Sequence, residues 1–205
     1  KIICTCRSFW CLAPITTASQ AAFLSIQGLW SGPWLMNVAG FSRAEAAQTL
    51  FWVAVAMIVG FISIGWLTQW LMKKKISATT TAVYGMSFFM IAQLLLVLLP
   101  IEAAVATWIF FGFTGTAGII AYAALSQSFD STLSGRVTTA INLLVFVTAF
   151  CTQWLVGYII DYFTADSSAL LNVAGFQWSF SFLLFLQFCG LSCFFLIKGK
   201  AIDVQ

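Results

Sequence analysis

Residues 46–75 read AAQTLFWVAVAMIVGFISIGWLTQWLMKKK, an uncharged run up to residue 72 that is followed by three consecutive lysines. A helix that crosses a lipid bilayer needs about 20 mainly apolar residues. A bilayer-crossing strand would alternate polar and apolar residues over about 10 positions, and this run shows no such alternation. The stretch therefore predicts a transmembrane helix with a basic anchor at its end.

The same pattern recurs along the chain. Five further uncharged stretches cover residues 8–42, 76–101, 103–129, 137–160 and 167–197. Each is long enough to cross a membrane as a helix, which satisfies its own backbone polar groups in lipid. We therefore predict an all-α integral membrane protein, a single domain over residues 1–205 with six transmembrane helices. Their approximate ranges are 13–37, 46–71, 78–99, 104–127, 137–160 and 176–197.

Composition excludes several other classes of protein. Of the 205 residues, 61% are hydrophobic and 7% are charged, whereas soluble domains average about 25% charged residues. These values exclude a soluble globular enzyme and a disordered chain. Histidine is missing, and Cys4, Cys6 and Cys11 lack the fourth ligand and the spacing of a zinc site. We therefore expect no enzyme activity, no cofactor and no metal, and the small net charge of +3 does not favour a nucleic-acid partner.

The basic residues indicate the orientation in the membrane. With six crossings, both termini and the connections after the second and fourth spans share one side. That side receives eight of the nine basic residues, Lys1, Arg7, Lys73, Lys74, Lys75, Arg136, Lys198 and Lys200. The other side receives only Arg43. Because cytoplasmic loops carry an excess of Lys and Arg, we predict cytoplasmic termini in a multi-pass protein of the plasma membrane, which in bacteria is the inner membrane.

A short motif occurs twice, three spans apart. Residues 65–69 and residues 157–161 both fit the pattern G-x-[LI]-x-[QD]. The first copy ends the second span on the cytoplasmic side, and the second copy ends the fifth span on the outer side. This placement predicts two three-helix units of inverted topology, about 13–99 and 104–197, an arrangement common in secondary transporters.

Three segments resemble the second six-helix half of a major facilitator superfamily transporter. The loop motif G-x-L-a-D-r-x-G-r-[rk] of that family is matched by Gly65, Leu67, Lys73 and Lys74. Gln69, Trp70 and Met72 depart from it at the usual Asp, Arg and Gly. Residues 134–136, which contain Arg136 and precede a helix with Asn142, are similar to the loop before the eleventh span of the family. Residues 28–34, GLWSGPW, are similar to its seventh span.

The resemblance implies half of a 12-helix transporter. Such a protein moves a small solute by rocking one six-helix half against the other, with secondary active or facilitative transport and no covalent chemistry. The other half would come from a missing N-terminal part, a partner chain or a second copy, and the lipid bilayer is the remaining partner. The alternative is a non-transporting membrane subunit or assembly partner. A membrane enzyme is disfavoured, because the spans hold no acidic or histidine cluster for acid–base work.

Polar and aromatic residues within the spans predict the substrate cavity. On the first span Gln20, Gln27 and Trp34 share a stripe at about 100° per residue, with Trp30 at its edge. Tyr122 ends a face of aromatic and glycine residues on the fourth span. Asn142 and Gln153 share a face of the fifth span, about 16 Å apart along the axis. The alternative for all of these positions is packing between helices.

Two further features predict moving parts. A bend or an unwound turn is predicted at Gly28, Gly32 and Pro33, because Pro33 leaves the Leu29 carbonyl without its helical donor. This segment is a candidate gate hinge, and a static kink is the alternative. At the cytoplasmic loop, Gln69 is a candidate for a hydrogen-bonded latch to residues 134–136.

Overall fold

The chain folds into a bundle of helices. The computed structural model describes residues 2–164 and 169–202, and every regular element within those residues is helical. Six segments are long and apolar enough to cross a membrane: Arg7–Asn37, Arg43–Lys73, Ala78–Leu98, Ile101–Gln127, Ser131–Phe163 and Val173–Lys198. The predicted all-α fold with six spans of membrane-crossing length and composition is therefore confirmed.

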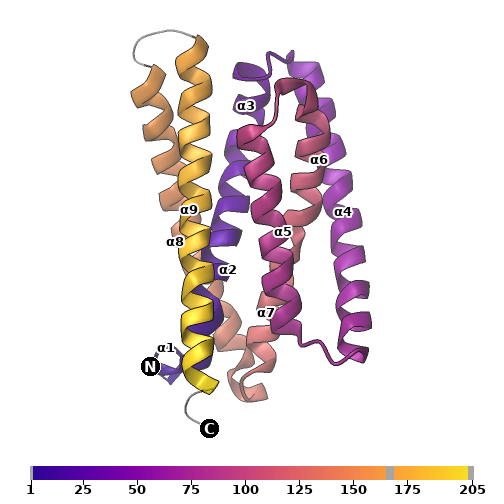
Figure 1. Cartoon of the computed structure of the whole chain (residues 1–205), viewed down its shortest axis with the longest axis vertical. Helices are drawn as coiled ribbons and strands as arrows, with labels where there is room; N and C mark the ends of the chain where they lie inside the picture. The colour runs from indigo at the N-terminus through magenta and orange to yellow at the C-terminus, as the bar shows by residue number, and fades with distance from the viewer. Residues whose placement is uncertain (1, 165–168, 203–205) are drawn as a thin grey trace.

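Several spans contain more than one element. In chain order and with the labels of Figure 1, the elements are α1 (Ile2–Thr5), α2 (Arg7–Ser25), η1 (Ile26–Trp30), α3 (Ser31–Asn37), α4 (Arg43–Lys73), α5 (Ala78–Leu98), η2 (Ile101–Ala103), α6 (Ala104–Gly115), η3 (Thr116–Gly118), α7 (Ile119–Gln127), α8 (Ser131–Thr164) and α9 (Ala169–Ile202). The turn η1 is π-helical, and η2 and η3 are 3-10 turns. The first span is thus α2–η1–α3, and the fourth is η2–α6–η3–α7.

Polar caps fix where two of the spans begin. Ser42 precedes α4 and forms a capping box, in which its hydroxyl accepts from the Glu45 N–H while its own N–H donates to the Glu45 carboxylate. Ser77 precedes α5 and accepts a hydrogen bond from the Thr80 N–H at 3.1 Å. Such caps satisfy N–H groups that the first turn of a helix leaves without acceptors.

Both termini lie at the same end of the bundle, together with the α4–α5 and α7–α8 connections (Figure 1). Arg7, at the start of α2, donates a hydrogen bond to the Ile197 carbonyl near the end of α9 at 2.7 Å. Lys73 ends α4, Lys74 and Lys75 follow it in the α4–α5 connection, and Arg136 lies near the start of α8. The described basic residues other than Arg43 therefore gather at this end.

The three spans of the first half pack mainly against helices of the second half, whereas α8 and α9 also pack on each other. The first span, α2, has α8 and α9 as its main partners. The second span, α4, packs mainly on α6, and the third, α5, packs on α6 and α7. By contrast, α4 makes few contacts with its neighbour in sequence, α5. Spans one to three and spans four to six are therefore interleaved, rather than set side by side as two separate groups.

Glycines allow the closest helix contacts. A Cβ atom at Gly112 on α6 would lie 3.0 Å from the Val53 carbonyl oxygen on α4, and one at Gly190 on α9 would lie 2.8 Å from the Ile15 Cα on α2. Small residues at such contacts let two backbones approach, which is how helices associate in lipid, where burial of apolar surface adds little. The glycine-rich face of the fourth span therefore packs against a neighbouring helix, which is the alternative to a cavity wall given above.

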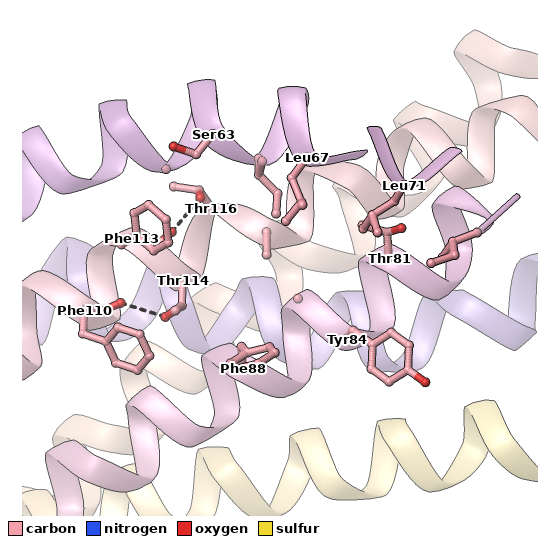
Figure 2. Close-up of a pocket in the computed structure, with 15 residues that line it drawn as sticks. Ser63, Leu67, Leu71, Thr81, Tyr84, Phe88, Phe110, Phe113, Thr114 and Thr116 are labelled. Carbon is pink, nitrogen blue, oxygen red and sulfur yellow. Dashed lines mark hydrogen bonds between the residues drawn. The ribbon is translucent and has the colours of Figure 1, made fainter. Parts of the chain in front are cut away.

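Large apolar side chains cover the outside of the bundle. Phe150 on α8 and Ile62 on α4 are 74% and 71% exposed. In water such a surface would be an aggregation hazard, but in a bilayer it faces hydrocarbon. Between α4, α5 and α6 this outer surface is hollowed by an apolar cavity of about 520 Å³ (Figure 2).

Candidate functional site

The first span departs from α-helical geometry in its second half, and the fourth span does so near its middle. In the first, Pro33 follows a π-helical turn over Ile26–Trp30, so the expected irregularity is present as a wide turn within a continuous helix. In the fourth, a 3-10 turn over Thr116–Gly118 separates α6 from α7. Both interruptions fall where glycines lower the cost of non-standard backbone.

Gln20 joins the two interrupted spans. Its side-chain nitrogen, Nε2, donates to the Gly115 carbonyl oxygen at 3.4 Å. A Cβ atom at Gly118 would overlap that same nitrogen, so a side chain there would force the Gln20 amide to move. Gln20 lies near the middle of the segment Arg7–Asn37, and Gly115 near the middle of Ile101–Gln127. The contact therefore lies in the central part of the bundle.

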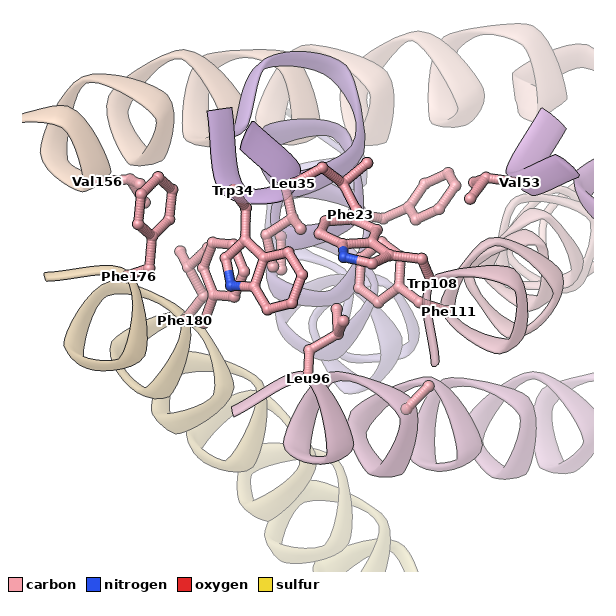
Figure 3. Close-up of a cluster of buried hydrophobic side chains, with 14 of the residues drawn as sticks. Phe23, Trp34, Leu35, Val53, Leu96, Trp108, Phe111, Val156, Phe176 and Phe180 are labelled. Atoms are coloured by element: carbon pink, nitrogen blue, oxygen red, sulfur yellow. The ribbon is translucent and has the colours of Figure 1, made fainter. Parts of the chain in front are cut away.

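An aromatic cluster fills the bundle beyond this contact, toward the end opposite the termini. Trp34 and Trp108 meet edge to face with ring centroids 5.6 Å apart, and Phe111 packs beside Trp108 at 5.4 Å (Figure 3). Trp34, a predicted cavity residue, is therefore buried in a packed core. The indole nitrogen of Trp108 is buried with no hydrogen-bond partner among the described residues.

Trp30 and Gln153, two more predicted cavity residues, are brought together between the first and fifth spans. The Trp30 indole N–H donates to the Gln153 carbonyl oxygen at 3.3 Å, and the Gln153 amide donates to the Leu24 carbonyl oxygen at 3.4 Å. Ser25 and Thr152 add a hydroxyl pair at 2.7 Å. These contacts form a polar seam along the boundary between α2–η1 and α8.

The remaining predicted cavity residues lie apart from one another. Gln27 is half-buried, and its carbonyl oxygen accepts from the Ser31 hydroxyl at 2.7 Å. Tyr122 is half-buried and packs on an apolar cluster of α2, α5, α7 and α8. Asn142 is exposed on α8 and thus lies on the outside of the six-helix bundle. The predicted set therefore does not form one pocket within this chain.

The predicted hinge residues keep open space around them. A Cβ atom at Gly28 or at Gly32 would have no heavy atom within 4 Å. Gly28 is exposed, and Gly32 and Pro33 are half-buried. The open space is confined to the glycines, because Ile26 and Trp30 of the same turn pack against neighbouring helices.

The loop-motif residues lie at the end of α4 nearest the termini. Gly65, Leu67, Gln69, Lys73 and Lys74 are exposed, as is Arg136 on α8. Figure 1 places α4 and α8 on opposite flanks of the bundle. Over the described chain no hydrogen bond joins Gln69 to residues 134–136, so the expected latch does not form between them here.

Sequence reasoning missed a buried amide pair between the third and sixth spans. The Gln187 amide donates to the Gln93 side-chain oxygen at 2.7 Å, and the Gln93 amide donates to the Phe180 carbonyl oxygen at 2.8 Å. Both side chains are fully buried. The available signal was the presence of an amide deep in each apolar run, since lipid penalises an amide that has no protein partner.

Comparison with known proteins identifies no relative for this chain. No family model matches the sequence, and no curated protein matches it at a significant level. The resemblance to major facilitator transporters therefore rests on the topology and the short motifs alone.

Proposed function

We propose that this chain is one half of a transporter of the major facilitator type, which moves a small solute across the plasma membrane by alternating access. The contact between the interrupted first and fourth spans, made by Gln20 on Gly115 and Gly118, carries the proposal. Interrupted spans at corresponding positions of two repeats are the best pointer to a transporter binding site, because broken helices expose backbone groups at the membrane midplane. Transport of this kind needs no catalytic residue and no covalent step.

The helix pairing supports an inverted repeat. If spans one to three correspond to spans four to six, the packing of α4 on α6 corresponds to the packing of α8 on α2. The packing of α5 on α6 and α7 likewise corresponds to that of α9 on α2. Gln93 and Gln187 are 94 residues apart and bond to each other. The same spacing, to within two residues, separates Gly65 from Gly157.

An exposed amide supports a second half. Asn142 lies within the span Ser131–Phe163 and is exposed on the isolated bundle. An amide facing hydrocarbon is penalised, so such residues face protein or a water-filled path. A second six-helix half placed against α8 would remove Asn142 from lipid and leave it beside the solute path. The cavity role of Gln27 and Tyr122, which are both half-buried, stays a prediction.

The turn at Gly28, Gly32 and Pro33 is the proposed gate hinge. Gly28 lies in the π-helical turn Ile26–Trp30, Gly32 and Pro33 lie in the following α3, and both glycines have open space around them. Hinges are a few residues that absorb changes in backbone angles, and glycines without close neighbours can do so at small steric cost. The basic end of the bundle faces the cytoplasm in this proposal, with both termini on that side.

A non-transporting membrane subunit is the second candidate. It is favoured by the seam in which Trp30 and Gln153 already bond to groups of this chain rather than to an open cavity. Hydrogen bonds of this kind commonly help membrane helices to associate. The two candidates differ in whether the face bearing Asn142 reaches water on both sides of the membrane.

Cysteine alkylation tests the proposed function. The full-length protein carrying Asn142→Cys as its only cysteine is treated in sealed vesicles with a membrane-impermeant maleimide on one side at a time. Alternating access predicts labelling from either side, because each side is open in part of the cycle. Phe185→Cys, at a position on α9 that is 60% exposed, is the lipid-facing control and should label from neither side. Labelling of Asn142→Cys from one side only would favour the non-transporting subunit.

A further inference from the structure

The apolar cavity between α4, α5 and α6 lies on the outer face of the bundle. Its walls include Leu67, Phe88, Phe110 and Phe113 (Figure 2). Phe88 is 57% exposed, and α4 and α5 make few contacts with each other. The cavity is thus a side groove that meets the hydrocarbon of a bilayer. Its volume of about 520 Å³ is in the range of sites that hold small organic ligands.

Three of the five hydroxyl-bearing residues that line the groove bond back to their own helices, and the other two are Ser63 and Tyr84. Thr81 donates to the Ser77 carbonyl oxygen, Thr114 to that of Phe110 and Thr116 to that of Phe113, at 3.1, 2.8 and 2.7 Å. A hydroxyl bonded back to its own helix offers little to a polar ligand. The groove therefore suits an apolar chain rather than a polar solute.

One end of the groove meets a concentration of positive charge. Leu71 and Ile76 both line the groove, and Lys73, Lys74 and Lys75 form the turn between them. All three lysines are exposed. Lys74 Nζ lies 4.0 Å above the centre of the Trp70 ring, which holds its ammonium group close to the end of α4.

The start of α5 adds to this positive field. Lys75 has a φ angle of 65°, a left-handed conformation that reverses the chain so that α5 begins at Ala78. The first N–H groups of a long helix carry partial positive charge and favour anions. The acidic residues Glu45 and Glu102 lie at the opposite end of the bundle, at the starts of the second and fourth spans.

We propose that the groove binds one anionic phospholipid, with an acyl chain along the apolar walls and the phosphate group at the lysine turn 73–75. The charge at the turn matches a lipid phosphate, and the adjoining walls match a hydrocarbon chain. Basic pockets between membrane helices on the cytoplasmic side select anionic lipids in this way. The site is separate from the contact between the first and fourth spans and does not rest on the transport proposal.

Native mass spectrometry of the purified chain in detergent tests the site. The probes are dioleoyl phosphatidylglycerol, which is anionic, and dioleoyl phosphatidylcholine, which is neutral overall. We expect phosphatidylglycerol to bind about tenfold more tightly or better, since each lysine near an anionic headgroup contributes to binding. The triple variant Lys73→Gln, Lys74→Gln, Lys75→Gln should remove that preference. The matched control, Arg136→Gln with Lys198→Gln, should keep it.

A second pair of variants tests the groove itself. Leu67→Trp places a larger side chain in the groove and should weaken binding of both lipids. Ile62→Trp, at a position on the same helix that is 71% exposed and does not line the groove, should leave both unchanged. Equal affinity of the wild-type chain for the two lipids would overturn the proposal. So would an unchanged phosphatidylglycerol preference in the triple-lysine variant, or unchanged binding in Leu67→Trp. None of these results depends on solute transport.

Discussion

At the scale of single residues, amide side chains make many of the polar contacts between spans. Gln20, Gln153 and Gln93 each donate to a backbone carbonyl of a distant span. Gln187 instead donates to another amide. A carbonyl at a helix interruption or beside a small residue is open to such a donor, so the amides mark places where helix backbones come close.

The Gln93–Gln187 bond predicts an energetic coupling between the third and sixth spans. Gln93→Leu and Gln187→Leu should each destabilise the fold, and the double variant should cost less than the sum of the two. We expect a coupling of about 0.5–1.5 kcal/mol, the range measured for hydrogen bonds between membrane helices. Unfolding in mixed micelles with increasing dodecyl sulfate measures it. Strictly additive effects would mean that the bond contributes nothing to stability.

Substitution of residues in the proposed cavity should reduce transport and leave insertion into the membrane unchanged. In the complete transporter, Gln27→Ala and Asn142→Ala should each slow uptake about three- to tenfold, the value of one net hydrogen bond to a solute. Surface biotinylation provides the control for insertion. Wild-type uptake in both variants would assign these amides to helix packing.

Sequence patterns located several of these residues but not their partners. The stripe on the first span indicated that Gln20 and Trp34 face protein, because amides are disfavoured on the side of a helix that faces lipid. In the structure Gln20 bonds to the Gly115 carbonyl and Trp34 is buried. The acceptors are backbone carbonyls far along the chain, and periodicity within one helix cannot indicate them. Gln93 was missed because it is the single amide of its apolar run and makes no stripe, and Gln187 was missed with it because its partner lies on a distant span.

At the scale of elements, charged residues set the ends of the helices. The predicted span 46–71 lies inside Arg43–Lys73, and the predicted span 78–99 nearly equals Ala78–Leu98. This agreement follows from the cost of charge in hydrocarbon, which is local and therefore visible in sequence. The π-helical form of the turn over Ile26–Trp30 could not be predicted in this way. A proline indicates that one carbonyl loses its helical donor, but it does not indicate how the backbone adjusts.

The close contact between α9 and α2 predicts a severe effect of a single methyl group. Gly190→Ala would place a Cβ atom 2.8 Å from the Ile15 backbone, so we expect a loss of about 1–3 kcal/mol from overpacking. Gly65→Ala is the matched control, since its Cβ would have no neighbour within 4 Å and alanine favours the helix. Unfolding in dodecyl sulfate compares the two. Equal stability of both variants would show that the helices can separate freely at Gly190.

At the scale of the whole molecule, the end that bears the lysine run should face the cytoplasm. On a background without other cysteines, Lys74→Cys should react only with reagents on the cytoplasmic side, and Glu102→Cys only with reagents outside. The reason is the gathering of basic residues at the end that holds both termini. Opposite labelling would invert the molecule and place the proposed lipid site in the outer leaflet.

The interleaved helix pairing also constrains how the protein is made. A ribosome delivers α2 to the membrane well before its main partners, α8 and α9. The bond from Arg7 to the Ile197 carbonyl spans nearly the whole chain. Until synthesis ends, the polar groups of α2 must be sheltered by the insertion machinery or by temporary neighbours. Biogenesis of this bundle should therefore depend on prolonged chaperoning of its first helix, and deletion of the last helix should expose the nascent chain to quality-control proteolysis.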